Sequence, residues 1–178
     1  MNKMNTVVTG ILAAVLAAGA LGAAAGEVSA AARPGFAPGV WVGTGVQKGI
    51  FSVTGDDPSP VDGTVRFSLN VSRSFRATGS LVLKTRMEID RAGVRGVLIG
   101  TATTKLTGTG SDVRFAGPLR LEGKLTDGTM TVPFTLTKAV AGRLLVTRAG
   151  CTRVVGRTDS QLAFKWTAVP KAGSRPRC

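Results

Sequence analysis

The sequence predicts an all-β domain: an antiparallel up-and-down barrel of about eight to ten short strands. Three observations support this fold class. Apolar and polar residues alternate with a period of two, turns that contain glycine separate the alternating stretches, and no long helical period follows residue 32. Short connections leave no room for parallel crossovers, and closure of a meander removes exposed edges. A two-sheet β-sandwich is the alternative.

Residues 1–32 predict an export signal, and residues 33–178 predict a single β domain. Lys3 provides a positive start, residues 7–25 are apolar apart from Thr9, and small residues gather around Ala30. This pattern is typical of a signal peptide that is cleaved, and an uncleaved membrane anchor is the alternative. The domain is therefore expected to be secreted or associated with the cell envelope, in an extracellular or periplasmic compartment.

The first strand is expected at residues 39–46, where Trp41, Gly43 and Gly45 share one side. A large indole beside two positions that lack side chains indicates tight packing over this side. An ordinary strand with a core tryptophan satisfies the pattern. The stretch Gly39-Val40-Trp41-Val42-Gly43-Thr44-Gly45 also resembles the first strand of calycin-type barrels, the lipocalins and the nitrobindin-like group.

This resemblance implies that Trp41 closes one end of a barrel and that an apolar cavity holds a small hydrophobic ligand. Its matching residues are Gly39, Trp41, Gly43 and Gly45. The nitrobindin-like group ligates haem through a histidine. The chain has no histidine, so haem held in that way is excluded, and no cofactor is expected.

Residues 54–63 predict a loop, because two prolines, two glycines and three aspartates interrupt regular structure. These aspartates lack the ligand spacing of an EF-hand calcium loop. They are expected to be solvated turn residues rather than metal ligands. A half-buried strand follows at residues 65–72, where every second residue from Val65 to Val71 is apolar.

Three strands are expected next, at residues 81–89, 97–106 and 113–122. In the second of them, Val97 and Ile99 are expected to continue the buried face. In the third, Gly117 and Pro118 predict an interruption, since neither residue favours a strand interior. A turn at residues 90–93 is expected to join the first two.

Asp127-Gly128 is the strongest local turn signal, and it predicts a hairpin with a two-residue type I′ turn. In the returning strand at residues 130–137, Pro133 cannot donate a ladder hydrogen bond. An edge strand or a bulge is therefore expected there. Three further short strands complete the set, around Leu144, around Val154 and at residues 162–168.

Large apolar side chains on the expected inner faces are the candidate ligand-binding residues. They are Trp41, Phe67, Met87, Phe115, Met130, Phe134, Phe164 and Trp166. Two interpretations remain open: the side chains fill the barrel as a solid core, as in small closed barrels, or they line a ligand cavity. An inner face that is bulky in every layer favours the core. Small residues gathered at one end, as at Gly43 and Gly45, favour the cavity.

Cys151 and Cys178 predict an intrachain disulfide, because an oxidising compartment favours pairing. Such a bond would tether the C-terminal tail and contribute roughly 3 kcal/mol in the chain-entropy treatment. Two free thiols or an intermolecular bond are the alternatives. Two sulfurs without a histidine are too few for a metal site, so no metal is expected.

The chain carries a formal net charge of +13, and Lys3 and Glu27 cancel within residues 1–32, so the domain keeps the whole excess. A basic exported protein attracts anionic partners such as lipid headgroups, acidic envelope polymers or nucleic acid. Because tyrosine is absent and only 5% of residues are aromatic, base stacking is poorly served and nucleic acid is not expected. Charge that only solubilises the β surface is the alternative.

Catalysis has few candidate groups. The absence of histidine removes the commonest general base and the usual triads. A carboxylate pair is the one enzymatic alternative left open, so a non-catalytic protein is expected. Two functions remain. One is a carrier that holds an apolar small molecule or lipid in the barrel interior; the other is a basic envelope-associated module that binds an anionic polymer or membrane surface without a small ligand.

Overall fold

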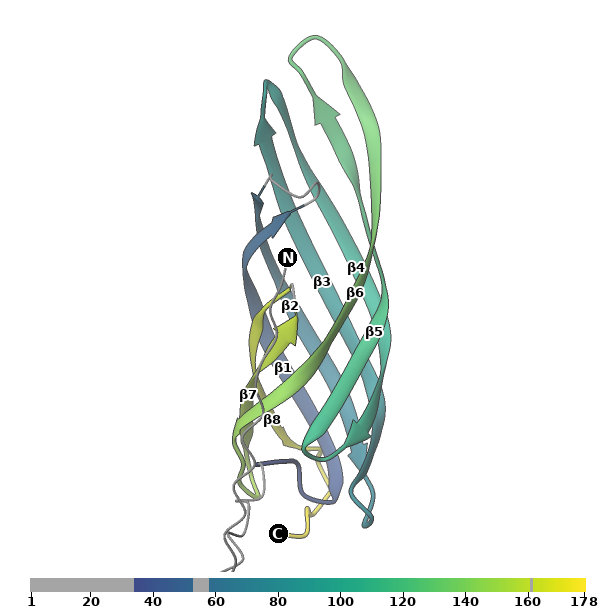
Figure 1. Ribbon diagram of the computed structural model, residues 1–178, viewed down its shortest axis with the longest axis vertical. Coiled ribbons are helices and arrows are strands. Elements are labelled where there is room, and N and C mark those ends of the chain that lie inside the picture. The colour runs from purple at the N-terminus through teal and green to yellow at the C-terminus, as the bar shows by residue number, and fades with distance from the viewer. Residues whose placement is uncertain (1–33, 53–57, 161) are drawn as a thin grey trace, which may run out of the picture. The chain divides into compact units, whose positions relative to one another are not determined.

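The computed structural model describes residues 34–52, 58–160 and 162–178, which form a closed ring of eight antiparallel strands (Figure 1). The strands are β1 (Gly39–Ser52), β2 (Pro58–Val71), β3 (Arg76–Arg91), β4 (Val94–Thr109), β5 (Asp112–Thr126), β6 (Thr131–Arg148), β7 (Val154–Ser160) and β8 (Phe164–Pro170). Each strand pairs with its sequence neighbours, and β1 pairs with β8. The predicted all-β up-and-down barrel is confirmed. The predicted export signal lies outside the described residues.

The strands differ in length. β1 to β6 have 14 to 18 residues, longer than expected, whereas β7 and β8 have 7 each. The expected break in the strand at Gly117 and Pro118 is wrong, because β5 continues through both residues and pairs with β6 there. An interruption is present only in the ladder with β4, where neither residue has a partner. The expected loop at residues 54–63 is wrong from Pro58 onward, where β2 begins.

The turns divide the barrel into two ends (Figure 1). The base comprises residues 34–38, the β2–β3, β4–β5 and β6–β7 turns, and the tail after β8. The far end holds the β3–β4 and β5–β6 hairpins, which reach beyond the short strands. Towards the far end, β6 pairs only with β5 until Gly142, where pairing with β7 begins. Pro133 lies on this free edge, so the predicted edge strand is confirmed.

Apolar side chains point inward and polar ones outward along most strands. The expected burial of Val97 and Ile99 is wrong: Leu98 is fully buried and Ile99 is 61% exposed. Because three consecutive residues are apolar, the sequence does not show which of them face inward. The pairing of Leu98 with buried Met87 on β3 places Leu98 on the inner face. Within the described ranges, no helix has the length and apolar character needed to cross a bilayer.

The turn chemistry differs from the expected one at the far end. Ala92 and Gly93, between β3 and β4, both have positive φ angles, 47° and 82°, as a type I′ turn requires. The hairpin at Asp127 and Gly128 is present but has four loop residues, 127–130, between β5 and β6. Its predicted two-residue turn is therefore wrong, because the Asp127 carboxylate caps a wider loop.

Candidate functional site

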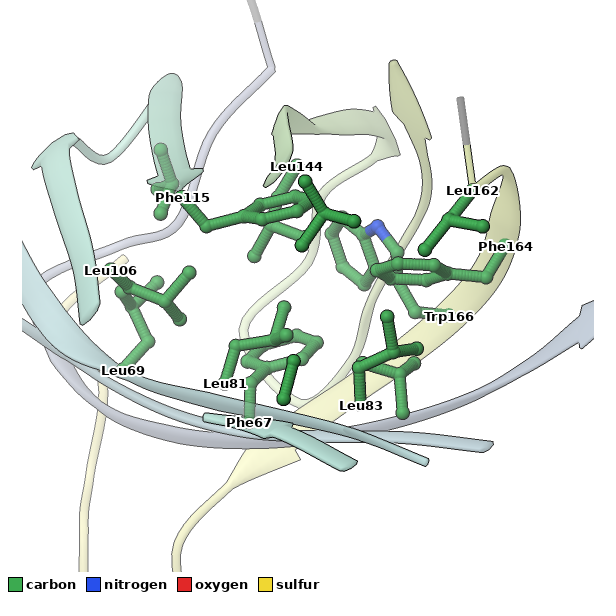
Figure 2. Packing of buried hydrophobic residues seen from close by; sticks show 14 of the residues in the cluster. Phe67, Leu69, Leu81, Leu83, Leu106, Phe115, Leu144, Leu162, Phe164 and Trp166 are labelled. Atoms are coloured by element: carbon green, nitrogen blue, oxygen red, sulfur yellow. The ribbon is translucent and has the colours of Figure 1, made fainter. Parts of the chain in front are cut away.

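The interior holds six of the eight candidate ligand-binding residues in a packed apolar cluster (Figure 2). The buried ones are Trp41, Phe67, Met87, Phe115, Phe164 and Trp166. Phe134 is half-buried at the edge of the cluster. The placement of Met130 on the inner face is wrong, since this residue lies in the β5–β6 loop and is 62% exposed.

The small residues of β1 do not open a cavity. A Cβ atom added at Gly43 would lie 2.1 Å from Cζ of Phe67. The same addition at Gly156, on β7, would lie 2.3 Å from Cζ2 of Trp166. Aromatic rings therefore occupy the space above these glycines. The inner face is bulky at the position where the small residues of β1 had suggested a ligand cavity.

Two buried polar atoms of the described core have no hydrogen-bond partner: Oγ1 of Thr104 and Nε1 of Trp166. Trp166 is 3% exposed, and its indole lies among Leu144, Phe115 and Phe164 in Figure 2. An unpaired buried donor costs free energy, so a small acceptor such as a water or a ligand oxygen would be stabilised there.

The base is closed by a plug that sequence reasoning missed. Phe36 is 1% exposed and stacks on Trp166 with ring centroids 5.5 Å apart. Its ring also meets the edge of Trp41 at 5.7 Å. The backbone N–H of Phe36 donates to the carbonyl of Gly110 at 2.8 Å. The only local signal is an aromatic residue five positions before Trp41.

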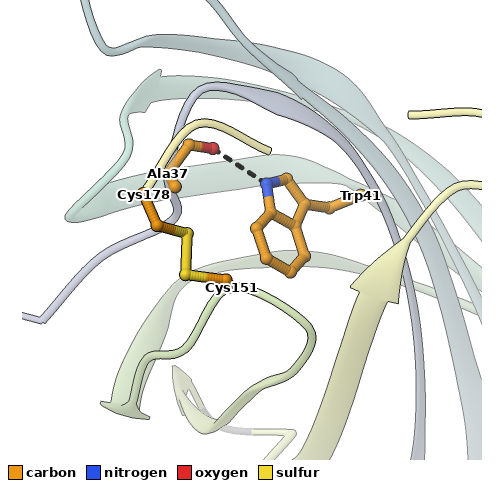
Figure 3. Close-up of a disulfide and its surroundings, with 4 residues drawn as sticks. All are labelled: Ala37, Trp41, Cys151 and Cys178. Atoms are coloured by element: carbon orange, nitrogen blue, oxygen red, sulfur yellow. Dashed lines mark hydrogen bonds between the residues drawn. A yellow bond between two sulfur atoms is a disulfide. The ribbon is translucent and has the colours of Figure 1, made fainter. Parts of the chain in front are cut away.

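The disulfide ties the C-terminal tail to the β6–β7 turn beside Trp41 (Figure 3). Cys151 and Cys178 have Cα atoms 5.8 Å apart, and the predicted pair is confirmed. The tail also follows β1: Lys171 N–H donates to the Val40 carbonyl at 2.8 Å, and Val40 N–H donates to Ser174 Oγ at 3.0 Å. The tail is thus fixed to the barrel along its length.

Seven exposed basic residues gather at the base. They are Arg73, Arg76, Arg148, Arg153, Lys171, Arg175 and Arg177. Within the described ranges, none of the seven forms an ion pair. The one acidic side chain described at this end, Asp112, already pairs with Arg114 through a 2.6 Å contact. Hydrogen bonding and charge from Asp112 raise the pKa of Arg114.

The β2–β3 turn presents a bulky side chain in an unusual backbone conformation. Phe75 has φ 59° and is 54% exposed. A left-handed conformation costs a non-glycine residue about 1–2 kcal/mol. The turn is nevertheless held firmly: Phe75 N–H donates to the Ser72 carbonyl at 2.9 Å, and the Phe75 carbonyl accepts from Gly110 N–H at 2.9 Å.

A second basic surface lies on the barrel wall. A groove of about 1030 Å³ crosses β7, β8, β1 and β2, and its lining includes four cations and no acid. The cations are Lys48, Arg66, Arg157 and Lys165. Arg157 and Lys165 stand directly opposite each other across the β7–β8 ladder, an unfavourable pairing of like charges that an anion would relieve.

Two glutamates of the wall are engaged in surface ion pairs. Glu88 contacts Arg86, and Glu122 contacts Arg120. In the part of the chain that the structure describes, no cluster of three potential metal ligands occurs. Five described acids therefore pair with nearby arginines, and the described acids do not converge on a metal site.

The geometry defines the class of protein as a closed eight-stranded β-barrel with a filled core and a strongly basic base. Comparisons with known protein families, with curated proteins and with solved structures find no match to this chain. The resemblance of residues 39–45 to calycin barrels therefore stays a prediction. The site must be interpreted from its own residues.

Proposed function

We propose that this protein is an exported, non-catalytic module that attaches to an anionic surface of the cell envelope through the base of its barrel. One observation carries the proposal: seven exposed cations without described ion-pair partners share one end. The chemistry that fits this face is a dense array of phosphate or carboxylate groups, on lipid headgroups or on an acidic polymer.

The fixed backbone of the base strengthens this binding. The β6–β7 turn and the tail are joined by the disulfide, and the tail is hydrogen-bonded to β1. Cations on a rigid support lose less conformational entropy when they bind. At about 1 kcal/mol per cation near an anionic membrane, seven cations give a dissociation constant on the order of 10 µM. Such binding weakens as salt rises.

The filled interior supports this proposal over a carrier function. Rings of Phe67 and Trp166 occupy the space above the inner glycines, and a bulky inner face was the condition that favours a module without a small ligand. The wall groove with its four cations adds a weaker site for the same class of anion.

The experiment compares two variants that remove equal charge. The base variant carries Arg73→Gln, Arg153→Gln and Arg177→Gln. The wall variant carries changes to glutamine at three exposed lysines, Lys84, Lys105 and Lys124. Binding to phosphatidylglycerol vesicles and to soluble polyphosphate is measured at about 0.1 M salt, with phosphatidylcholine vesicles as the neutral control.

We expect the base variant to bind about 100-fold more weakly, since three cations near the surface are lost. The wall variant should bind less than about threefold more weakly, because its three lysines lie away from the docked surface. Equal losses would mean that net charge, not the base, governs attachment. Absence of binding to both anionic probes would overturn the function itself.

A carrier function is the second candidate, and the unpaired Nε1 of Trp166 is the observation that favours it. A ligand with one acceptor oxygen and an apolar body would satisfy this donor and contact the apolar side chains around it. Native mass spectrometry of protein from its own host tests this idea. An extra mass of a few hundred daltons that disappears on denaturation would support a carrier, and a bare polypeptide would reject it.

A further inference from the structure

Phe75 combines three properties that ordinary folding requirements do not explain together. It is a bulky residue at φ 59°, its side chain is 54% exposed, and it occupies a position where glycine would be free of strain. Strained residues that the surrounding structure holds in place are concentrated at functional sites. The conformation of Phe75 therefore points to a role for its ring outside the barrel.

Hydrogen bonds fix the backbone of the turn that carries this ring. Both backbone groups of Phe75 are hydrogen-bonded, to Ser72 and to Gly110. The N–H of Arg76 donates to Ser72 Oγ at 3.1 Å, and Ser72 N–H donates to the Arg76 carbonyl at 2.9 Å. The backbone is thus held from both sides, while Phe75 stays 54% exposed.

The neighbours of Phe75 indicate what the ring would meet. Arg73 and Arg76 flank it, and the other cations of the base lie at the same end of the barrel. Among the described residues that are large, apolar and exposed, Phe75 is the one aromatic. An aromatic ring beside arginines matches the interfacial region of an anionic bilayer, which accepts the ring among acyl chains and the cations among headgroups. A soluble polyanion offers the ring no comparable environment.

We propose that Phe75 inserts into the interfacial region of an anionic lipid bilayer when the base docks. This inference rests on the proposed attachment through the base and names its partner as a lipid membrane. Insertion adds a short-range apolar contact to the long-range attraction of the arginines. It also orients the barrel with its base towards the membrane and its hairpins away from it.

The test uses the full protein with phosphatidylglycerol vesicles and soluble polyphosphate. Phe75→Ala should weaken vesicle binding about tenfold and leave polyphosphate binding unchanged. Met130→Ala is the matched control, because Met130 is similarly exposed at the far end, and it should change neither. Phe75→Gly should raise the melting temperature by relieving the positive φ, yet bind vesicles as weakly as Phe75→Ala. A purely structural role would lower stability instead.

A second readout locates the ring directly. Phe75→Trp introduces an exposed indole, whereas Trp41 and Trp166 are buried, so a blue shift on vesicle addition reports insertion. Quenching by brominated lipid should follow. Vesicle binding without a shift, and without an effect of Phe75→Ala, would overturn insertion but leave electrostatic attachment standing. Binding to polyphosphate alone would also overturn insertion, and binding to neither probe would remove the proposed function as well.

Discussion

The two ends of the barrel differ in how they are closed and in how their charged side chains are arranged. At the base, Phe36 plugs the interior, the disulfide fastens the tail, and seven cations remain without described partners. At the far end, long hairpins rise past the short strands, and Arg95 forms an ion pair with Asp90. The comparison teaches that the plug, the disulfide and a set of cations without described partners occur together at the base. This is the arrangement expected of a rigid surface that meets a partner.

The largest expected effect comes from removing the plug. Phe36→Ala should destabilise the protein by about 3–5 kcal/mol, the usual loss for a fully buried phenylalanine. Phe134→Ala at the half-buried far end should cost less than half of that. Guanidinium denaturation with the disulfide intact measures both. Equal losses would break the contrast between a packed base and a looser far end.

Loss of the disulfide should have the next largest effect. The double change Cys151→Ser and Cys178→Ser should lower the free energy of unfolding by about 3 kcal/mol, because the unfolded chain regains loop entropy. Thermal melting of the variant, beside reduced wild-type protein, gives the value. If the melting temperature stays the same, the tail hydrogen bonds alone hold the base.

Two glycines of β1 sharpen the comparison within one strand face. Gly43→Ala should destabilise by about 1–3 kcal/mol, because the added Cβ meets the ring of Phe67 and overpacks the core. Gly49 lies nearer the far end and has no atom within 4 Å of an added Cβ. Gly49→Ala should therefore stay within about 0.5 kcal/mol of the wild type. Urea denaturation measures the free energy of unfolding of both variants. Equal losses would show that the ring of Phe67 does not make Gly43 a tighter position than Gly49.

The smallest effect is expected at Asp127 in the far-end loop. Its carboxylate accepts from Met130 N–H at 2.8 Å and from both groups of Thr129, and these bonds lower the pKa of Asp127 from 3.8 to about 2. Because the folded pKa is depressed, the stabilisation is present above pH about 4 and is lost as the pH falls towards 2.

Asp127→Asn should remove this pH dependence from the hairpin. Amide exchange of residues 126–131 between pH 5 and pH 2 measures it, since the loop should open as wild-type Asp127 is protonated. Amide exchange at the base of the barrel, for example of the Phe36 N–H, serves as the internal control. Parallel pH profiles for the wild type and the variant would show that the carboxylate does not hold the loop.

The fold was largely predictable because its main signal is local. The alternation from Val65 to Val71 marks an inner face whatever the strand pairs with. Strand length and parity were less predictable, since they depend on register between distant segments. Val97, Leu98 and Ile99 are all apolar, and only the pairing of Leu98 with Met87 determines which side is buried.

The candidate site was less predictable for a topological reason. Arg73, Arg153 and Arg177 are far apart in the sequence and share a surface because alternate turns of a meander lie at the same end. Summing the charges of alternate turns would have found the base. Phe75 gave no comparable signal, because nothing in its neighbours predicts a positive φ at a phenylalanine.

The seam between β1 and β8 also sets the order in which the barrel can assemble. Every other strand pair joins sequence neighbours, whereas Trp41 meets Pro170 across most of the chain. Hairpins can therefore zip together early, and ring closure comes last with the greatest loss of loop entropy. One side of this seam is β8, which has only 7 residues and is followed around the ring by the equally short β7, so transient opening should begin there and spread from β8.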